Sequence, residues 1–354
     1  MRENSKKVLV VYWSSRNLGV LDNIINSLED AGFKIKEMQF NYLQQFSINK
    51  ILHIRSNTNI LNLLYLLILG LKLNLTILLY KRVYLFGSNL PLFCPFFINK
   101  GKLVCHYNEV PKFFDNSNSV VLKYEKAIFK NALNIVVSNA LRQQLFETIN
   151  KKATYYILDN ILAFKYYEHD EYSFKKVNIP IKLLYSGIIS KNREIVRIVR
   201  AIKSNDKFVL TLIGEIENSY SKIFLDEIQG NENIIYLGKV PFEMALKLTK
   251  ETDFGIAIYN LKDKNNLLCA PVKIHEYFHF RKPVISLENP PLLHIAEEFQ
   301  IVFPLKEIEE LQKSKTAETL LDSKINSINF EKFEESSLKE FNLTINNLLQ
   351  TVMK

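Results

Sequence analysis

The chain has 354 residues, of which 47% are hydrophobic and 23% are charged, with 10 Gly, 10 Pro and 3 Cys. This composition excludes a disordered or fibrous protein, and the length predicts two domains. The formal net charge of +9 belongs to the first half, because residues 1–180 hold 23 Lys and Arg against 13 Asp and Glu, whereas residues 181–354 hold 23 against 24.

Short apolar runs alternate with helical segments along the first half of the chain, a pattern typical of βαβ units in a parallel sheet. Helices are predicted over residues 21–31 and 120–133. The predicted strands are residues 7–13, 34–40, 50–55, 83–88, 102–107 and 134–138.

The N-terminal run and the cysteines bear on the cellular compartment. Basic residues precede an apolar run of seven residues, but no small-residue cleavage site follows, so the run predicts a buried strand and not a signal peptide. No two of the three cysteines, Cys94, Cys105 and Cys269, form a C-x-x-C pair. Their number and spacing predict buried thiols in a reducing compartment. We therefore expect a cytoplasmic protein.

The most apolar stretch covers residues 60–80, but polar residues interrupt it, so it is not predicted to cross a membrane. Between Met38 and His106 no residue is acidic, although that span carries seven Lys and Arg. Such a surface suits the anionic inner face of the cytoplasmic membrane, and the alternative is a solvated basic face over an ordinary core. No nucleic-acid-binding motif is present, so nucleic acid is not a predicted partner.

A polar, aromatic stretch at residues 163–180 coincides with the change in charge balance. It predicts a linker at 166–180 between an N-terminal domain, 1–165, and a C-terminal domain, 181–330, with a helix at 331–354 that returns to the N-terminal domain. In the second half the predicted strands are residues 181–187, 207–215, 234–240, 254–259, 282–287 and 301–304. We expect an α/β protein of two Rossmann-like, doubly wound domains with a ligand cleft between them.

His275, Glu276 and His279 form the pattern H-E-x-x-H, in which two histidines one turn apart bind zinc. Glu298 lies at the third-ligand spacing of one class of zinc aminopeptidases. However, Lys282-Pro283 limits the helix to about ten residues, too short for a well-braced metal site. A zinc peptidase is therefore the remote alternative, and we interpret both histidines as packing residues and expect no metal.

The same helix begins at Pro271, which places free N–H groups and the positive end of the helix dipole beside the expected ligand. Lys273, in the first turn, is unfavourable there unless an anion such as a diphosphate binds. Helix side chains lean toward the N-terminus, so Glu276 points back to that anion and can accept hydrogen bonds from both hydroxyls of a ribose. The alternative for Glu276 is a solvated glutamate.

The segment APVKIHEYFHFRKPVIS resembles the donor-binding segment of retaining GT-B glycosyltransferases of family 4, which commonly reads S/A-P-x-K-x-x-E-Y-x-x-x-G-K-P-V-I. The segments LLYSGIISKNREIVRIVRAI, LTLIGE and NIIYLGKVPFEMALKLTKETDFGIAIY precede it in that family's order. The resemblance covers residues 181–305 and is weak in the first half. It implies a GT-B fold and a nucleotide-sugar donor, UDP- or GDP-linked, with no cofactor required.

The resemblance also implies roles for residues of the second half. Glu276 would bind the ribose, and Lys273 with the amides after Pro271 would face the diphosphate. Arg193, or Lys191 in its place, would neutralise the leaving phosphate. The remaining implied donor contacts are the backbones of Gly187 and Gly214.

In the first half the resemblance implies residues beside the transferred sugar and the acceptor. His106, at a predicted strand end, resembles the family histidine that contacts the sugar, with Glu109 as the alternative if Asn108-Glu109 matches the family's His-Glu pair. The loop after the first strand holds the remaining candidates, which are Gly19 for close backbone approach and Arg16 and Asn17 for the acceptor or a phosphate.

Two departures from the family pattern bear on activity. Leu268 stands where the family often has a second acid, and Arg281 replaces the usual Gly. The resemblance implies a hexosyltransferase that acts in cell-surface polysaccharide or glycolipid assembly, such as capsule or lipopolysaccharide, on a lipid-linked or glycan acceptor. Together with the basic first half of the chain, it predicts a protein that lies peripherally on the membrane. The alternatives are a GT-B-fold nucleotide-sugar 2-epimerase and an inactive GT-B module that binds glycans or partner proteins.

Overall fold

The structure is a computed structural model and describes residues 7–13, 18–40, 60–115, 119–161, 179–203, 205–306 and 328–351. The chain divides into two compact units, unit 1 with Met1–Asp159 and Lys339–Lys354, and unit 2 with Asn160–Leu338. The strand predicted at 50–55 lies outside the described residues, as does most of the predicted linker. The predicted domain boundaries and roles stay predictions.

The described part of unit 1 is built on a six-stranded parallel sheet with the strand order β2-β1-β3-β4-β5-β6. The strands are β1 (Lys7–Trp13), β2 (Lys34–Phe40), β3 (Arg82–Phe86), β4 (Leu103–Tyr107), β5 (Asn134–Val137) and β6 (Thr154–Ile157). The helices are α1 (Leu18–Asp30), α3 (Ile60–Leu78), α4 (Val120–Asn131) and α5 (Ala140–Glu147), with the 3-10 turns η2 (Leu90–Phe93) and η3 (Lys112–Asp115). The edge strand β6 was not predicted.

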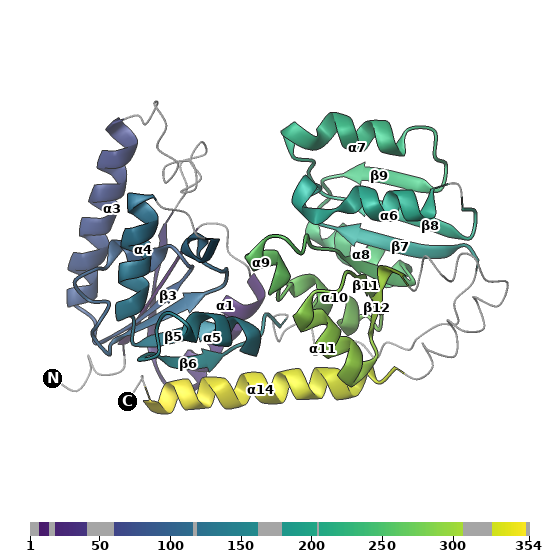
Figure 1. Cartoon of the computed structure of the whole chain (residues 1–354). Coiled ribbons are helices and arrows are strands. Elements are labelled where there is room, and N and C mark those ends of the chain that lie inside the picture. Colours follow the sequence, from purple (N-terminus) through teal and green to yellow (C-terminus); the bar gives the residue numbers. More distant parts are fainter. Residues whose placement is uncertain are drawn as a thin grey trace. The chain divides into compact units, whose positions relative to one another are not determined.

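Strand order reverses at β1, since β2 lies on one side of it and β3 on the other. Right-handed crossovers therefore put α1 and α3 on opposite faces of the sheet. The face that carries α3 and α4, which lie side by side in Figure 1, holds a core of apolar residues from both helices and from alternate positions of the strands. Lys102 closes α3, because its Nζ donates to Ile77 O at 2.9 Å and to Tyr80 O at 3.2 Å.

The described part of unit 2 repeats this plan with the strand order β12-β11-β10-β7-β8-β9, all parallel. The strands are β7 (Ile181–Ser186), β8 (Phe208–Ile213), β9 (Ile234–Gly238), β10 (Phe254–Ala257), β11 (Val284–Ser286) and β12 (Val302–Pro304). The helices are α6 (Ile195–Ile202), α7 (Ser221–Ile228), α8 (Phe242–Glu251), α9 (Lys264–Leu267), α10 (Val272–His279) and α11 (Pro290–Phe299), with the 3-10 turns η5 (Lys191–Arg193) and η6 (Asn218–Tyr220).

The two faces of this second sheet carry different helices. Apolar residues of α6 and α7 pack on one face together with Leu183 and Tyr185 of β7. The alternate residue Leu184 packs on the other face with α10, α11 and the start of α14 (Phe330–Thr351). In Figure 1 these two groups of helices lie on either side of β7. From Lys339 onward α14 belongs to unit 1, where Phe341, Ile345 and Leu348 are buried.

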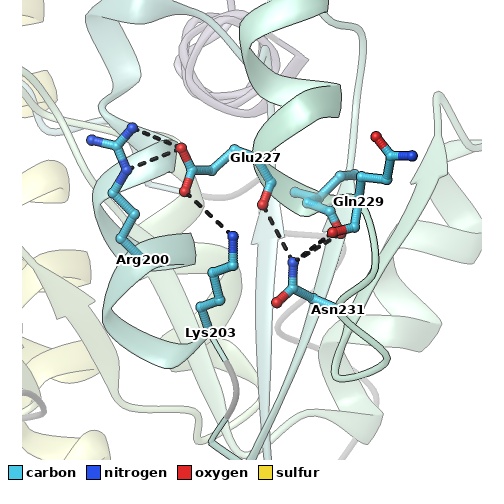
Figure 2. A network of polar contacts seen from close by, with 6 residues as sticks. Arg200, Lys203, Glu227, Gln229 and Asn231 are labelled. Carbon is cyan, nitrogen blue, oxygen red and sulfur yellow. Dashed lines mark hydrogen bonds and ion pairs between the residues drawn. The ribbon is translucent and has the colours of Figure 1, made fainter.

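A polar network joins α6 to α7 on the surface of unit 2 (Figure 2). The Arg200 guanidinium donates through Nε and Nη2 to Glu227 Oε2, at 3.0 and 2.7 Å, and Lys203 lies 4.0 Å from the other carboxylate oxygen. Asn231 then caps α7, since its Nδ2 donates to the carbonyls of Glu227, Ile228 and Gln229. The network fixes the pair of helices that covers this face of the sheet.

Two predictions about the whole chain can be compared with the structure. Cys94, Cys105 and Cys269 are all buried free thiols, as predicted from their number and spacing. Within the described ranges, no helix combines the length and the apolar character that crossing a membrane would need.

Candidate functional site

The candidate donor site lies where the strand order of unit 2 reverses, at the carboxyl ends of β7 and β10. Open α/β sheets bind ligands at such a position because the loops diverge there. The loop after β10 contacts the loop after β7, since Asn260 N donates to Asn192 O at 3.0 Å and Asn266 Nδ2 donates to the same oxygen at 3.4 Å. These contacts fix the edge from which the site residues project.

Packing on the sheet places α10 at this edge. A Cβ on Gly255 of β10 would lie 2.3 Å from the Tyr277 ring, so only glycine lets α10 approach the strand this closely. The Tyr277 hydroxyl then donates to Leu184 O of β7 at 3.1 Å. The helix was expected to begin at Pro271 and begins one residue later, at Val272, with Pro271 as its N-cap and no side chain capping it.

Lys273 and Glu276 form an ion pair within α10. Lys273 Nζ lies 2.6 Å from Glu276 Oε2, at the i,i+3 spacing that brings helix side chains together. Glu276 is only 7% exposed, so it is not the solvated glutamate of the alternative interpretation. The expected conflict of Lys273 with the helix dipole is therefore relieved by a carboxylate of the same helix, before any ligand binds.

Arg193 and Lys191 differ in their surroundings although both lie in η5. The Arg193 guanidinium sits over the ring of Tyr259, 4.5 Å from its centroid, in a cation-π contact. Burial raises the pKa of Tyr259, and the charge of Arg193 opposes that rise. Lys191 is exposed. The structure thus holds Arg193, and not Lys191, against the loop that leads to α10.

Gly187 and Gly214, in the loops expected to approach the nucleotide, are in close backbone contact with each other. Gly214, after β8, has φ 134°, and a Cβ there would lie 1.9 Å from Gly187 O. Gly187 follows β7, and its N–H donates to Ile213 O at 3.0 Å. The close packing of these two loops therefore requires glycine at position 214, independently of any ligand.

The histidines of the H-E-x-x-H pattern contact neighbouring helices. The His275 ring packs 5.6 Å from the Phe333 ring, and His279 Nδ1 lies 3.4 Å from Glu334 Oε1, both on α14. Glu298 pairs with His294 at 3.6 Å on α11. In the described part of the chain no group of three His, Cys, Asp or Glu is arranged to hold a metal ion.

Unit 1 has a second polar cluster where β3 and β4 end. Ser88 Oγ donates to Asn108 Oδ1 at 3.2 Å and accepts from Glu109 N at 3.1 Å. The buried Arg142 of α5 donates through Nη1 to Asn108 O at 2.6 Å and to Ser138 Oγ at 3.2 Å. Of the two predicted sugar-contact residues, Glu109 is the one that lies beyond the strand with an exposed side chain.

His106 lies inside unit 1, in β4. Its side chain is 0% exposed within β4, and Nδ1 lies 2.9 Å from the Tyr84 hydroxyl. Burial, together with the charge of Arg142, lowers the pKa of His106 to about 3, so the ring is neutral. A side chain without accessible surface cannot hydrogen-bond a sugar in this conformation. The strand ends at Tyr107, as the sequence predicts, and His106 is the residue before that end.

The other first-half candidates are placed in part. Gly19 is buried in the first turn of α1, and Arg16 and Asn17 lie outside the described residues. Sequence reasoning missed Tyr259 and Arg142. Tyr259 could have been found, because it ends a predicted strand at the ligand edge, whereas Arg142 is recognisable only once the strand order brings α5 to Asn108.

No protein-family model and no curated protein sequence matches this chain. Solved structures do match it. HepE of Anabaena in complex with UDP-glucose superposes with a TM-score of 0.67 at 12% identity, over 97% of this chain and 99% of that chain. WaaG, a glycosyltransferase involved in lipopolysaccharide biosynthesis, gives 0.61 at 10% identity over 90% and 94%.

A UDP-GlcNAc 2-epimerase from Methanocaldococcus jannaschii also matches, with a TM-score of 0.52 at 15% identity over 87% of this chain and 91% of that chain. Glycosyltransferases and epimerases thus share this architecture. The chain has the GT-B fold, with two Rossmann-like domains built on parallel six-stranded sheets in its described residues.

Proposed function

We propose that this protein is a glycosyltransferase that takes a sugar from a nucleoside-diphosphate donor and transfers it to a hydroxyl acceptor. The observation that carries the proposal is the paired Lys273 and Glu276 in the first turns of α10, at the switch point of the unit 2 sheet. Structural neighbours bound to UDP-glucose and to UDP support a nucleotide-sugar donor.

The residues present suit the charge changes of glycosyl transfer. The leaving nucleoside diphosphate gains negative charge, which the N-terminus of α10, Lys273 and Arg193 would stabilise as fixed positive groups. Lys273 holds Oε2 of Glu276, and we assign Oε1 to the hydroxyls of the ribose. Pro271 contributes no N–H, so the amides that follow it would meet the diphosphate.

The finer assignment extends the resemblance to family 4. We assign a hexosyl donor linked to UDP or GDP, transfer with retention, and a lipid-linked or glycan acceptor of cell-surface polysaccharide or glycolipid assembly. Unit 2 would bind the donor, and unit 1 would bind the acceptor near Glu109, which lies at the carboxyl end of β4. Leu268, at the C-cap of α9, supplies no carboxylate to the sugar.

Donor binding is tested by thermal unfolding of the full chain with UDP, GDP, UDP-glucose, UDP-N-acetylglucosamine and GDP-mannose. One nucleotide class should stabilise the protein, by about 2.7 kcal/mol at a concentration 100 times the Kd. Glu276→Ala should weaken that binding about 10- to 100-fold, because a hydrogen bond to a charged group contributes about 1.5–3 kcal/mol. Glu298→Ala, which removes an exposed helix glutamate of α11, is the matched control and should bind like the wild type.

Products then separate transfer from epimerisation. A glycosyltransferase releases free nucleoside diphosphate and hydrolyses its donor slowly without acceptor, whereas a 2-epimerase converts UDP-N-acetylglucosamine into its 2-epimer and keeps the sugar linked. Release of UDP or GDP that disappears in Glu276→Ala supports the proposal. Epimer formation, or the absence of stabilisation by every nucleotide tried, contradicts it.

A further inference from the structure

Helix α3 exposes an apolar face to solvent. Six apolar residues, from α3 and the turn that follows it, are between 56% and 77% exposed. They are Leu67, Ile68, Leu71, Leu75, Leu78 and Leu79. At about 100° per residue they occupy one arc of about 120° on the helix surface. Surface helices of water-soluble proteins normally carry polar side chains there, so this face needs a partner.

The opposite face of α3 fixes which side is exposed. Leu73 and Ile77 are buried in the core of unit 1. Asn74 holds the rotation of the helix, because its Nδ2 donates to Phe93 O of η2 at 2.6 Å. Lys102 holds the carboxyl end. The exposed leucines therefore cannot turn inward without breaking these contacts.

Charge identifies the partner. Lys72 lies at the border of the apolar arc, Lys81 and Lys102 lie at the carboxyl end of α3, and Lys100 is exposed nearby in the chain. The sequence contains no Asp or Glu between Met38 and Asn108. A second copy of this surface would bring like charges together, whereas an anionic surface would be attracted to it.

We infer that the α3 face is a docking surface for an anionic lipid bilayer. The exposed apolar residues enter the boundary between headgroups and acyl chains, and Lys72, Lys81 and Lys100 contact phosphate groups. The helix lies in the plane of the membrane, in agreement with the absence of a spanning helix from the described ranges. The inference does not depend on the donor site, which lies in unit 2.

Flotation of the full chain with lipid vesicles tests the inference. The protein should bind vesicles of phosphatidylcholine with 30% phosphatidylglycerol and bind pure phosphatidylcholine at least tenfold more weakly. The double variant L71Q/L75Q should reduce binding at least tenfold, because two leucines at the centre of the face no longer enter the lipid. K72Q/K81Q should reduce it roughly 25-fold at low salt, about fivefold for each lysine, and little at high salt.

The control is I223Q/L225Q, which replaces two exposed apolar residues of α7 in unit 2 and should bind vesicles like the wild type. Nucleotide binding of each variant shows that unit 2 is folded and tests the donor site separately. Equal vesicle binding by L71Q/L75Q and the wild type overturns the inference, as does no vesicle binding at all. A dimer in solution that L71Q/L75Q converts to a monomer also overturns it, because the partner would then be a second copy.

Discussion

Glu125 is a buried carboxyl group whose ionised form is destabilised by the surrounding protein. It lies on α4 with 5% of its surface exposed, and burial raises its pKa to about 7, against the opposing charge of Lys112. The unfolded chain has the ordinary pKa of about 4.5, so below that pH the carboxyl is protonated in both states and its burial costs no ionisation energy. That cost appears as the pH rises toward 7, so Glu125 opposes folding in neutral and alkaline solution.

We predict that Glu125→Gln stabilises the protein at pH 8 by up to about 3 kcal/mol and has little effect at pH 4. Urea unfolding at the two pH values measures this difference. Glu232→Gln, which alters an exposed glutamate in the turn before β9, should change stability by less than about 0.5 kcal/mol at either pH. Equal effects of Glu125→Gln at pH 4 and pH 8 would show that the side chain is already ionised without cost.

Arg281 stands where the family that this segment resembles usually has glycine. It follows α10 with φ 57°, a left-handed conformation that costs a residue other than glycine about 1–2 kcal/mol. Its Nη1 donates to Glu334 Oε2 at 3.1 Å. Burial alone would raise the pKa of Glu334, but the hydrogen bonds and charges of His279 and Arg281 outweigh burial and lower it. The ion pair with α14 offsets the backbone strain that glycine would avoid.

At the scale of elements, the contact between β10 and α10 connects the fold to the candidate site. We predict that Gly255→Ala destabilises the protein by about 1–3 kcal/mol, because its Cβ would overlap the Tyr277 ring. It should also weaken nucleotide binding at least tenfold, because α10 must shift and it carries both Lys273 and Glu276. Thermal unfolding and nucleotide titration measure the two effects.

Gly101→Ala is the matched control, since nothing lies within 4 Å of a Cβ at that position. It should leave stability within about 0.5 kcal/mol and nucleotide binding unchanged. If Gly255→Ala lowers stability but binds nucleotide normally, α10 does not hold the donor. If it alters neither, the close approach of Tyr277 is not required.

Local sequence predicted the elements better than their contacts. The start of α10 was predicted from Pro271 to within one residue. The pairing of Lys273 with Glu276 was not predicted, although their i,i+3 spacing permits it. The contact of Arg193 with Tyr259 joins two loops, so it needs the strand order as well as the sequence. Strand β6 was missed because four residues at a sheet edge show no clear alternation. The exposed apolar face of α3 was not predicted because leucine and isoleucine occupy both the buried and the exposed side of the helix.

At the scale of the whole molecule, alternation of strands and helices was enough to predict two Rossmann-like domains. Composition and periodicity report such a repeated plan directly, because each βαβ unit must bury both faces of its sheet. The register of β4 was not accessible in this way. The predicted end of the strand at residue 107 agrees with the structure, but it did not show that His106 is buried and Glu109, three positions later, is exposed.

The C-terminal helix gives a prediction at this scale, since α14 starts in unit 2 and belongs to unit 1 from Lys339 onward. Deletion of residues 339–354 removes Phe341, Ile345 and Leu348 from the core of unit 1. Each contributes roughly 1.5–3 kcal/mol by burial, so the loss approaches the roughly 5–15 kcal/mol that stabilises a typical domain.

Hydrogen exchange measured by mass spectrometry should therefore show lost protection in β1, β3 and β4 of the truncated chain, while β7, β8 and β10 stay protected and nucleotide binding persists. Leu343→Ala in the full chain, which truncates a side chain that is 60% exposed on the same helix, should change neither unit. If both units lose protection together, the two sheets unfold as one cooperative structure. Residues 339–354 of α14 then stabilise both units and not unit 1 alone. If neither does, the strands and remaining helices of unit 1 suffice, and burial of these three side chains contributes far less than their area implies.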